Sequence, residues 1–138
     1  MLGLLLVVLL LSVADAHAQE PSVLPLRDSI EFGVISSSPG VCRLNRRGSL
    51  IGLSGQDCIG QGQTARYLIQ GTANRIINIQ AAGSSIGNLR FEPNIGRRTT
   101  RALNGNGRRR FTVWGDLVVG NNVHGAYALA YTVSINYE

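Results

Sequence analysis

Residues 127–137 read YALAYTVSINY, and bulky apolar side chains occupy every second position of this stretch. Small or polar residues fill the positions between them, and no 3.6-residue pattern competes. Successive side chains of a β-strand point to opposite faces, so a period of two is typical of a strand with one buried face. The stretch therefore predicts one long C-terminal strand, whose buried face consists of Tyr127, Leu129, Tyr131, Val133, Ile135 and Tyr137.

The rest of the chain has the pattern of short strands separated by turns. Seventeen glycines punctuate runs of β-branched and aromatic residues, and no amphipathic helix of useful length is visible. Residues 111–119 alternate around Gly115, which indicates a bulge or bend. Residues 120–125 predict a hairpin between the last two strands, and the sequence NGNG at 104–107 favours a type I′ turn. Further strands are expected at 49–53, 66–70, 75–81 and 89–92.

These strands favour one antiparallel all-β domain over residues 28–138. About seven to nine strands at this spacing predict an immunoglobulin-like β-sandwich, with a small closed β-barrel as the alternative. Residues 19–27 precede the domain and contain Pro21 and Pro25. Because proline cannot donate to a strand ladder, this segment is expected to be an edge strand or a free N-terminal extension.

The first 18 residues predict a cleaved signal peptide. Residues 1–13 are almost wholly apolar, and Ala16 and Ala18 form an A-x-A cleavage pattern, although the usual cationic start is missing. A transmembrane anchor is the alternative, but the apolar run is shorter than the about 20 residues that span a bilayer. We therefore expect a mature chain that begins at Gln19 and is exported from a bacterial cytoplasm.

Two cysteines, Cys42 and Cys58, are the only ones in the chain. In an oxidising compartment an isolated pair predicts a disulfide, which is worth about 3 kcal/mol for a loop of about 15 residues. Two free buried thiols are the alternative. A zinc site is not expected, because neither cysteine has a second ligand at the usual spacing.

All thirteen basic residues are arginine, and the formal net charge is +5. Clusters of this kind attract polyanions, including nucleic acid and the phosphates of bacterial surface glycolipids, although a solvated basic face is the plainer interpretation. No aromatic side chain is interleaved with the arginines, so nucleic-acid binding is not favoured. The candidate anion-binding residues are Arg97, Arg98, Arg101, Arg108, Arg109 and Arg110, and Arg46 and Arg47 form another pair.

The sequence offers little for catalysis. His124 is the only histidine of the expected mature chain and lies in a predicted loop, where a polar turn residue is more usual than a base. No pair of carboxylates is marked by its position, and Gly60-Gln61-Gly62 lacks the strand and helix of a phosphate-binding loop. Trp114 could stack on a ligand, but core packing is the expected role. We predict no enzyme activity, no cofactor and no metal.

The end of the chain resembles a known family. Residues 111–137 read FTVWGDLVVGNNVHGAYALAYTVSINY and resemble the C-terminal signature of the Gram-negative "domain of unknown function" family 4402. IEFGVI at 30–35 and ARYLIQGTANRIINIQ at 65–80 are similar to two further segments of that family. The matching positions of the C-terminal signature are Gly115, Leu117, Val119, Gly120, Gly125, Tyr127, Val133 and Tyr137.

The resemblance implies a fimbrial or pilus-type subunit. Members of the family look like small exported sandwiches of the periplasm or cell surface, without catalytic residues to carry over. Pilins are completed by an N-terminal strand of a neighbour, which makes Val23, Leu24 and Leu26 candidate donor-strand residues. The implied partners are copies of this chain or related subunits, a periplasmic chaperone and an usher. The alternative function is a monomeric module that binds anionic glycans or lipids through the arginine clusters.

Overall fold

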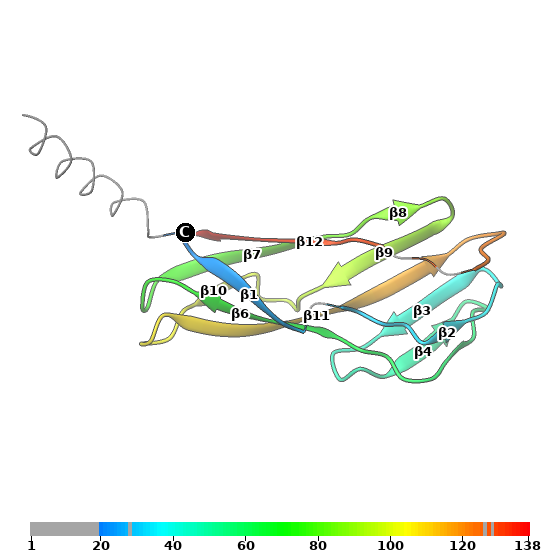
Figure 1. Ribbon diagram of the computed structural model, residues 1–138, viewed down its shortest axis with the longest axis horizontal. Helices are drawn as coiled ribbons and strands as arrows, with labels where there is room; N and C mark the ends of the chain where they lie inside the picture. Colours follow the sequence, from blue (N-terminus) through cyan, green and yellow to red (C-terminus); the bar gives the residue numbers. More distant parts are fainter. Residues whose placement is uncertain (1–19, 28, 126, 128) are drawn as a thin grey trace, which may run out of the picture.

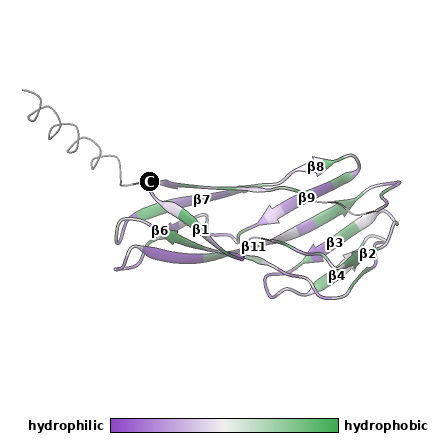
Figure 2. Cartoon of the chain, in the orientation of Figure 1, coloured by the Kyte–Doolittle hydropathy of each residue, from purple (hydrophilic) through white to green (hydrophobic). Residues whose placement is uncertain are grey.

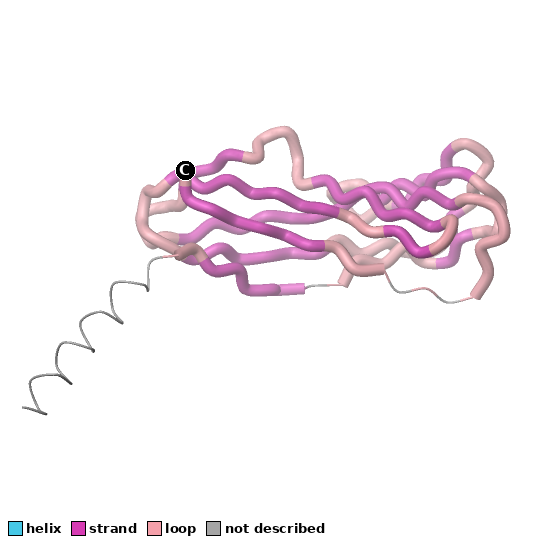
Figure 3. The backbone as a smooth tube through the Cα atoms, turned by 90° about the horizontal axis from the view of Figure 1, so that it is seen from above, coloured by secondary structure: helices cyan, strands magenta, loops and turns pink. Residues whose placement is uncertain are grey.

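The computed structural model describes residues 20–27, 29–125, 127 and 129–138, and this part of the chain consists of strands and loops. The predicted signal peptide, Gln19 and the start of the predicted domain at Asp28 lie outside the described residues. All strand pairs are antiparallel, which confirms the all-β antiparallel fold class. Figures 1 and 3 show the strands running along the long axis of an elongated molecule.

The described residues form twelve strands, more than the seven to nine expected, because four of them have only two or three residues. In chain order the strands are β1 (Ser22–Arg27), β2 (Val34–Ile35), β3 (Gly40–Leu44), β4 (Leu50–Leu53), β5 (Cys58–Ile59), β6 (Ala65–Gln70), β7 (Ile76–Ala82), β8 (Ser85–Ile86), β9 (Leu89–Asn94), β10 (Thr100–Ala102), β11 (Arg108–Val119) and β12 (Thr132–Tyr137).

Three sheets are present. A seven-stranded sheet runs in the order β1-β6-β11-β3-β4, with β9 paired to β11 and β8 paired to β9. A three-stranded sheet has the order β10-β7-β12, and β2 pairs with β5 in a small two-stranded sheet. The large sheet and the three-stranded sheet pack face to face, so the fold is a β-sandwich for part of its length.

Strand β11 is the longest strand and passes through both halves of the large sheet. Its first half pairs with β6, and its second half pairs with β3 and with β9. The pairing with β9 continues without a register shift across Gly115, so the bulge expected there is wrong. A Cβ at Gly115 would lie 2.2 Å from the carbonyl oxygen of Glu92, so only glycine permits this close approach of β9.

The first core lies between the large sheet and the three-stranded sheet. Side chains of β6 and β11 meet side chains of β7, and Figure 2 shows hydrophobic residues on all three strands. Val23 of β1 and the inner side chains of β12 pack against this core. Its buried residues are Ala65, Ile69, Ile77, Ile79, Ile95, Leu103, Phe111 and Val113.

The second core lies under the other half of the large sheet. It is covered mainly by residues outside the sheets, among them Ile30, Phe32, Val123, Leu129 and Tyr131, and by the small β2–β5 pair. Its buried residues are Cys42, Leu89, Phe91, Leu117, Val119 and Val123. One half of the large sheet is therefore covered by the three-stranded sheet, and the other half is covered mostly by loops.

Two strand connections differ from the sequence prediction. Residues 120–125 do not form a hairpin, because β12 pairs with β7 in the other sheet and not with β11. The last strand begins at Thr132 rather than at Tyr127, since its partner β7 ends at Ala82, opposite Thr132. Tyr127 is 43% exposed, so its predicted place on the buried face is wrong.

The turn at 104–107 also differs from the expected type. A type I′ turn needs positive φ at both central residues, and in this turn only Gly107 has one, at 70°. The side-chain oxygen of Asn104 instead accepts the amides of Asn106 and Arg108, both at 2.9 Å. Asparagine thus stabilises the turn through its side chain rather than through its backbone conformation.

Candidate functional site

The predicted donor segment forms β1, an edge strand of the same domain. Among the described strands it pairs only with β6, and the register shifts between Pro25 and Arg27. Val23 is half-buried against the first core, whereas Leu24 and Leu26 are 44% and 53% exposed. Of the two alternatives for this segment, the structure therefore has the edge strand. The donor role of Val23, Leu24 and Leu26 stays a prediction.

Side-chain bonds fix only the end of β1. The Arg27 Nε donates to the carbonyl oxygen of Thr64 at 2.8 Å, and its Nη2 donates to the Thr64 hydroxyl at 3.2 Å. Thr64 is itself buried, at 3% exposure. The preceding part of the strand is held by its backbone ladder and by Val23.

An apolar groove lies over the second core. It has a volume of about 760 Å³, and its floor is formed by Leu89, Phe91 and Leu117. Residues 29–35 form one wall, and Gly125, Tyr127, Leu129 and Tyr131 contribute to the other. The sequence alternation at 127–137 suggested a regular strand here, so the groove was not anticipated.

The six candidate anion-binding arginines do not form one patch. Arg108 and Arg110 alternate with the buried Phe111 and Val113, which places them on the outer face of the large sheet. Arg109 has the opposite orientation along the strand, and its Nη1 donates to the carbonyl oxygen of Ala102 at 3.5 Å. Arg97 is exposed in the crossover that leads to β10.

Arg101 is the most enclosed of these arginines. Its Nη2 donates to the carbonyl oxygen of Ile95 at 2.9 Å, and its Nε donates to that of Arg98 at 3.1 Å. Burial lowers the pKa of the Arg101 guanidinium, and the positive charges of Arg109, Arg46 and Arg98 lower it further. Each of these three arginines therefore lies close enough to Arg101 to repel its charge.

Trp114 lies beside this group rather than in a core. It is half-buried on the outer side of β11 and belongs to neither cluster of buried residues, so the expected core packing is wrong. The guanidinium carbon of Arg46 lies 5.9 Å from the centre of the Trp114 ring, within the range of a cation–π contact. The sequence does not reveal this contact, because Arg46 follows β3 and Trp114 lies in β11, and these two strands are far apart in the chain.

Cys42 and Cys58 form a disulfide, as predicted. Their Cα atoms are 5.9 Å apart, which is normal for such a bond. Cys42 is fully buried in β3, and Cys58 lies in β5. The bond therefore ties the small β2–β5 sheet to the large sheet at the second core.

The described residues hold no obvious catalytic constellation. His124 is exposed in the connection after β11, and Asp116 and Glu92 are bound to Arg43 and Arg90. Within the described ranges, no group of three or more His, Cys, Asp or Glu residues could hold a metal ion. No helix in this part of the chain is long and apolar enough to cross a membrane.

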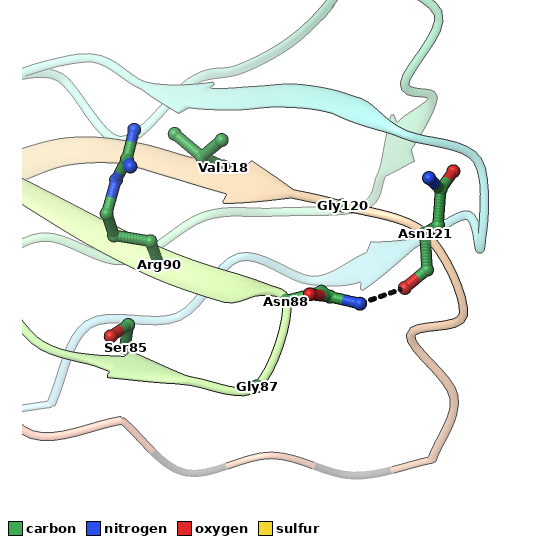
Figure 4. Close-up of a pocket in the computed structure, with 7 residues that line it drawn as sticks. All are labelled: Ser85, Gly87, Asn88, Arg90, Val118, Gly120 and Asn121. Carbon is green, nitrogen blue, oxygen red and sulfur yellow. Dashed lines mark hydrogen bonds between the residues drawn. The ribbon is translucent and has the colours of Figure 1, made fainter.

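A hollow at the tip of β9 and β11 is lined mainly by polar and small residues. Figure 4 shows Asn88 donating to the carbonyl oxygen of Asn121, at 2.8 Å, with Arg90 and Val118 on the neighbouring strands. Arg90 is the charged residue of this lining, and its Nη2 lies 2.8 Å from Glu92. The hydrogen bond joins the turn between β8 and β9 to the loop after β11. This hollow therefore belongs to the end of the large sheet.

Comparison with family models, curated proteins and solved structures found no match. The resemblance to family 4402 therefore rests on the quoted segments and stays a hypothesis.

Proposed function

We propose that the protein is a non-enzymatic, exported subunit, similar to a fimbrial subunit, that assembles by exchange of its N-terminal strand. The observation that carries the proposal is that β1 is an edge strand whose attachment depends mainly on its backbone pairing with β6. This strand lies at the beginning of the described chain and at an edge of the large sheet, and only Val23 of its six side chains is half-buried. The resemblance of the quoted sequence segments to family 4402 and the predicted signal peptide support the same conclusion.

Strand exchange needs no new interface. If β1 of one copy leaves β6, the identical strand of a second copy can occupy its position with Val23 opposite Ile69 and Leu24 opposite Leu68. The ladder hydrogen bonds lost within one chain are regained between chains, so the main cost is that of association. Each copy gives one strand and receives one, which allows an open polymer to grow.

The proposed location is the periplasm or cell surface of a Gram-negative bacterium. The disulfide at the second core is the kind of bond that persists in an oxidising compartment. A periplasmic chaperone that holds the β6 edge before assembly, and an outer-membrane usher, are the proposed partners.

A pair of engineered cysteines tests the exchange in the full mature chain. Leu24 and Leu68 are direct cross-strand partners, so the double variant Leu24→Cys/Leu68→Cys can form a bond between β1 and β6. In concentrated protein we expect covalent ladders on a denaturing, non-reducing gel. The single variants Leu24→Cys and Leu68→Cys are the matched controls and should give at most dimers. A double variant that crosslinks only within single chains at every concentration would contradict the proposal.

A peptide experiment tests the same site without relying on assembly. A variant lacking residues 20–27 should bind a synthetic peptide of those residues, with new amide-exchange protection in β6. The same peptide with Val23→Asp is the control and should bind far less, since a charge replaces the one half-buried side chain. Protection that appears along the apolar groove instead of β6 would show that the attachment site is wrong.

A further inference from the structure

A second hollow lies on the outer side of the large sheet, next to Trp114. It has a volume of about 400 Å³ and sits between the ends of β3 and β9. Trp114 and Asp116 reach it from β11, because they alternate with the buried residues of that strand. The other lining residues are Arg43, Leu44, Asn45, Glu92, Pro93, Asn94 and Gly115.

The polar groups of this hollow are held in place. Arg43 and Asp116 form a two-point pair, with Nε to Oδ1 at 3.0 Å and Nη2 to Oδ2 at 3.1 Å. The side-chain oxygen of Asn45 accepts the amides of Arg47 and Ser49, at 2.9 and 3.0 Å. These bonds orient the side chain and leave its NH₂ group as a donor.

Asn94 is fixed in the same manner. Its side-chain oxygen accepts the amide of Gly96 at 2.8 Å, which again leaves an NH₂ group as a donor. An aromatic ring beside oriented amides and a carboxylate–guanidinium pair suits a ligand with both apolar C–H faces and hydroxyl groups. Pyranose sugars have this character, since their C–H faces pack on aromatic rings and their hydroxyls bond planar polar side chains.

Two arginines lie beside the Trp114 ring. Arg46 lies over the ring, and the Arg101 guanidinium is fixed by two carbonyl oxygens. Among the described residues the only ion pairs are Arg43–Asp116 and Arg90–Glu92, so Arg46 and Arg101 are not neutralised by a carboxylate. Arginines held without an acidic partner favour the binding of an anion.

Gly96 leaves space between the ring and Arg101. A Cβ at this position would lie 3.5 Å from Trp114 Cη2 and 3.6 Å from Arg101 Nη2, with no other described side chain or distant backbone atom within 4 Å. Gly96 therefore lies beside both the ring and the guanidinium, so Trp114 and Arg101 are near enough to each other for one ligand to contact both.

We propose that the Trp114 hollow binds an acidic saccharide, with a sugar ring against Trp114 and its sulfate, phosphate or carboxylate group on Arg46 and Arg101. A flat bilayer fits less well, because the ring lines a hollow and none of the large exposed apolar side chains that the structure describes is among its lining residues. The inference is independent of strand exchange, since no residue of β1 or β6 lines this hollow.

Calorimetric titration of the mature protein tests the site. The probe is a sulfated tetrasaccharide, and a neutral tetrasaccharide and vesicles containing phosphatidylglycerol are the comparison ligands. We expect the sulfated sugar to bind and to be weakened about tenfold by Trp114→Ala and by Arg46→Gln. Arg46 is exposed, so its variant is expected to fold normally, which thermal unfolding will check.

The matched control is Arg108→Gln, which removes the same charge from an exposed position at the start of β11, six residues before Trp114. It should leave the affinity within about twofold, because at moderate salt a distant surface charge is largely screened. Equal losses in Arg46→Gln and Arg108→Gln would reduce the effect to net charge and overturn the proposal. Absence of binding, or stronger binding to the vesicles that depends on Trp114, would overturn it as well.

Discussion

The two cores share the large sheet and β11, but they are closed in different ways. The first core is covered by the three-stranded sheet, so both of its walls are built from paired strands. The second core is covered by loop segments and the two-residue strands β2 and β5. One half of the molecule is therefore an ordinary sandwich, and the other is a sheet with a mostly irregular cover.

The difference shows how irregular segments can still be held on a sheet. The cover of the second core is fixed by the Cys42–Cys58 disulfide and by Gln56, which is 2% exposed. Gln56 accepts from the amide and the hydroxyl of Ser36 and donates to the carbonyl oxygens of Ser36 and Ser38. Covalent and polar links take the role that strand pairing has in the first core.

The largest effect is expected for truncation in the first core. Phe111 is 3% exposed, and its ring stacks on that of Tyr67 with 5.2 Å between the ring centres. Phe111→Ala should therefore lower the free energy of unfolding by about 4 kcal/mol. Phe91→Ala in the second core should cost about 1 kcal/mol less, because the cavity opens into the apolar groove and is not fully enclosed. Urea unfolding measures both. An equal or larger loss for Phe91→Ala would remove the distinction between the cores.

Loss of the disulfide should affect mainly the second core. The double variant Cys42→Ala/Cys58→Ala is expected to lower the free energy of unfolding by about 3 kcal/mol. Hydrogen exchange should rise in β2 and β5 while β7 stays protected, since β7 has no contact with the bond. Uniform loss of protection over both sheets would show that the cover is not a separate unit.

The polar link should matter less than the covalent one. Gln56→Ala leaves backbone groups of residues 36 and 38 without their partner, at an expected cost of about 2 kcal/mol. Urea unfolding gives this value, and Gln63→Ala is the control, because that side chain bonds Ser29 in an exposed setting. Equal effects of the two variants would show that the burial of Gln56 has no energetic importance.

The smallest effect is expected at the far end of the first core. The hydroxyl of Tyr137 accepts the amide of Thr72 at 2.8 Å, and its ring contacts Arg75. Tyr137→Phe removes the hydrogen bond but keeps the ring, so unfolding free energy should fall by about 1 kcal/mol or less. Thermal unfolding measures this loss, and Tyr127→Phe, at a residue outside the strands, is the reference variant. A larger loss of stability in Tyr127→Phe than in Tyr137→Phe would contradict the prediction.

Side-chain alternation identified the strands but not their partners. The pattern at 111–119 correctly indicates β11, and the same pattern indicates the part of the last strand from Thr132 onward. Alternation reports which face of a segment is apolar, and it is equally present at Leu129 and Tyr131, which pack against the second core outside the described strands. The hairpin predicted at 120–125 is wrong for this reason. Nearness in sequence suggested that β11 and β12 pair with each other, but they lie in different sheets.

The basic clusters were visible in the sequence, but their arrangement was not. Neighbouring arginines at 108–110 alternate between the two faces of β11, so a run in sequence is divided in space. Arg46 and Trp114 come together only because β3 pairs with β11. A strand register was needed to find that contact, and no local pattern specifies it. The disulfide was predictable because the chain has only two cysteines.

The position of β11 near the end of the chain has a consequence for biosynthesis. Strands β3, β6 and β9 all precede it, and each depends on it for a central pairing. A nascent chain that has not reached residue 119 can complete neither core, so it emerges with unsatisfied strand edges and cannot fold stepwise from its N-terminus. Holding such a chain unfolded until release is a natural task for a chaperone, and truncation before β11 should yield protein that is rapidly degraded.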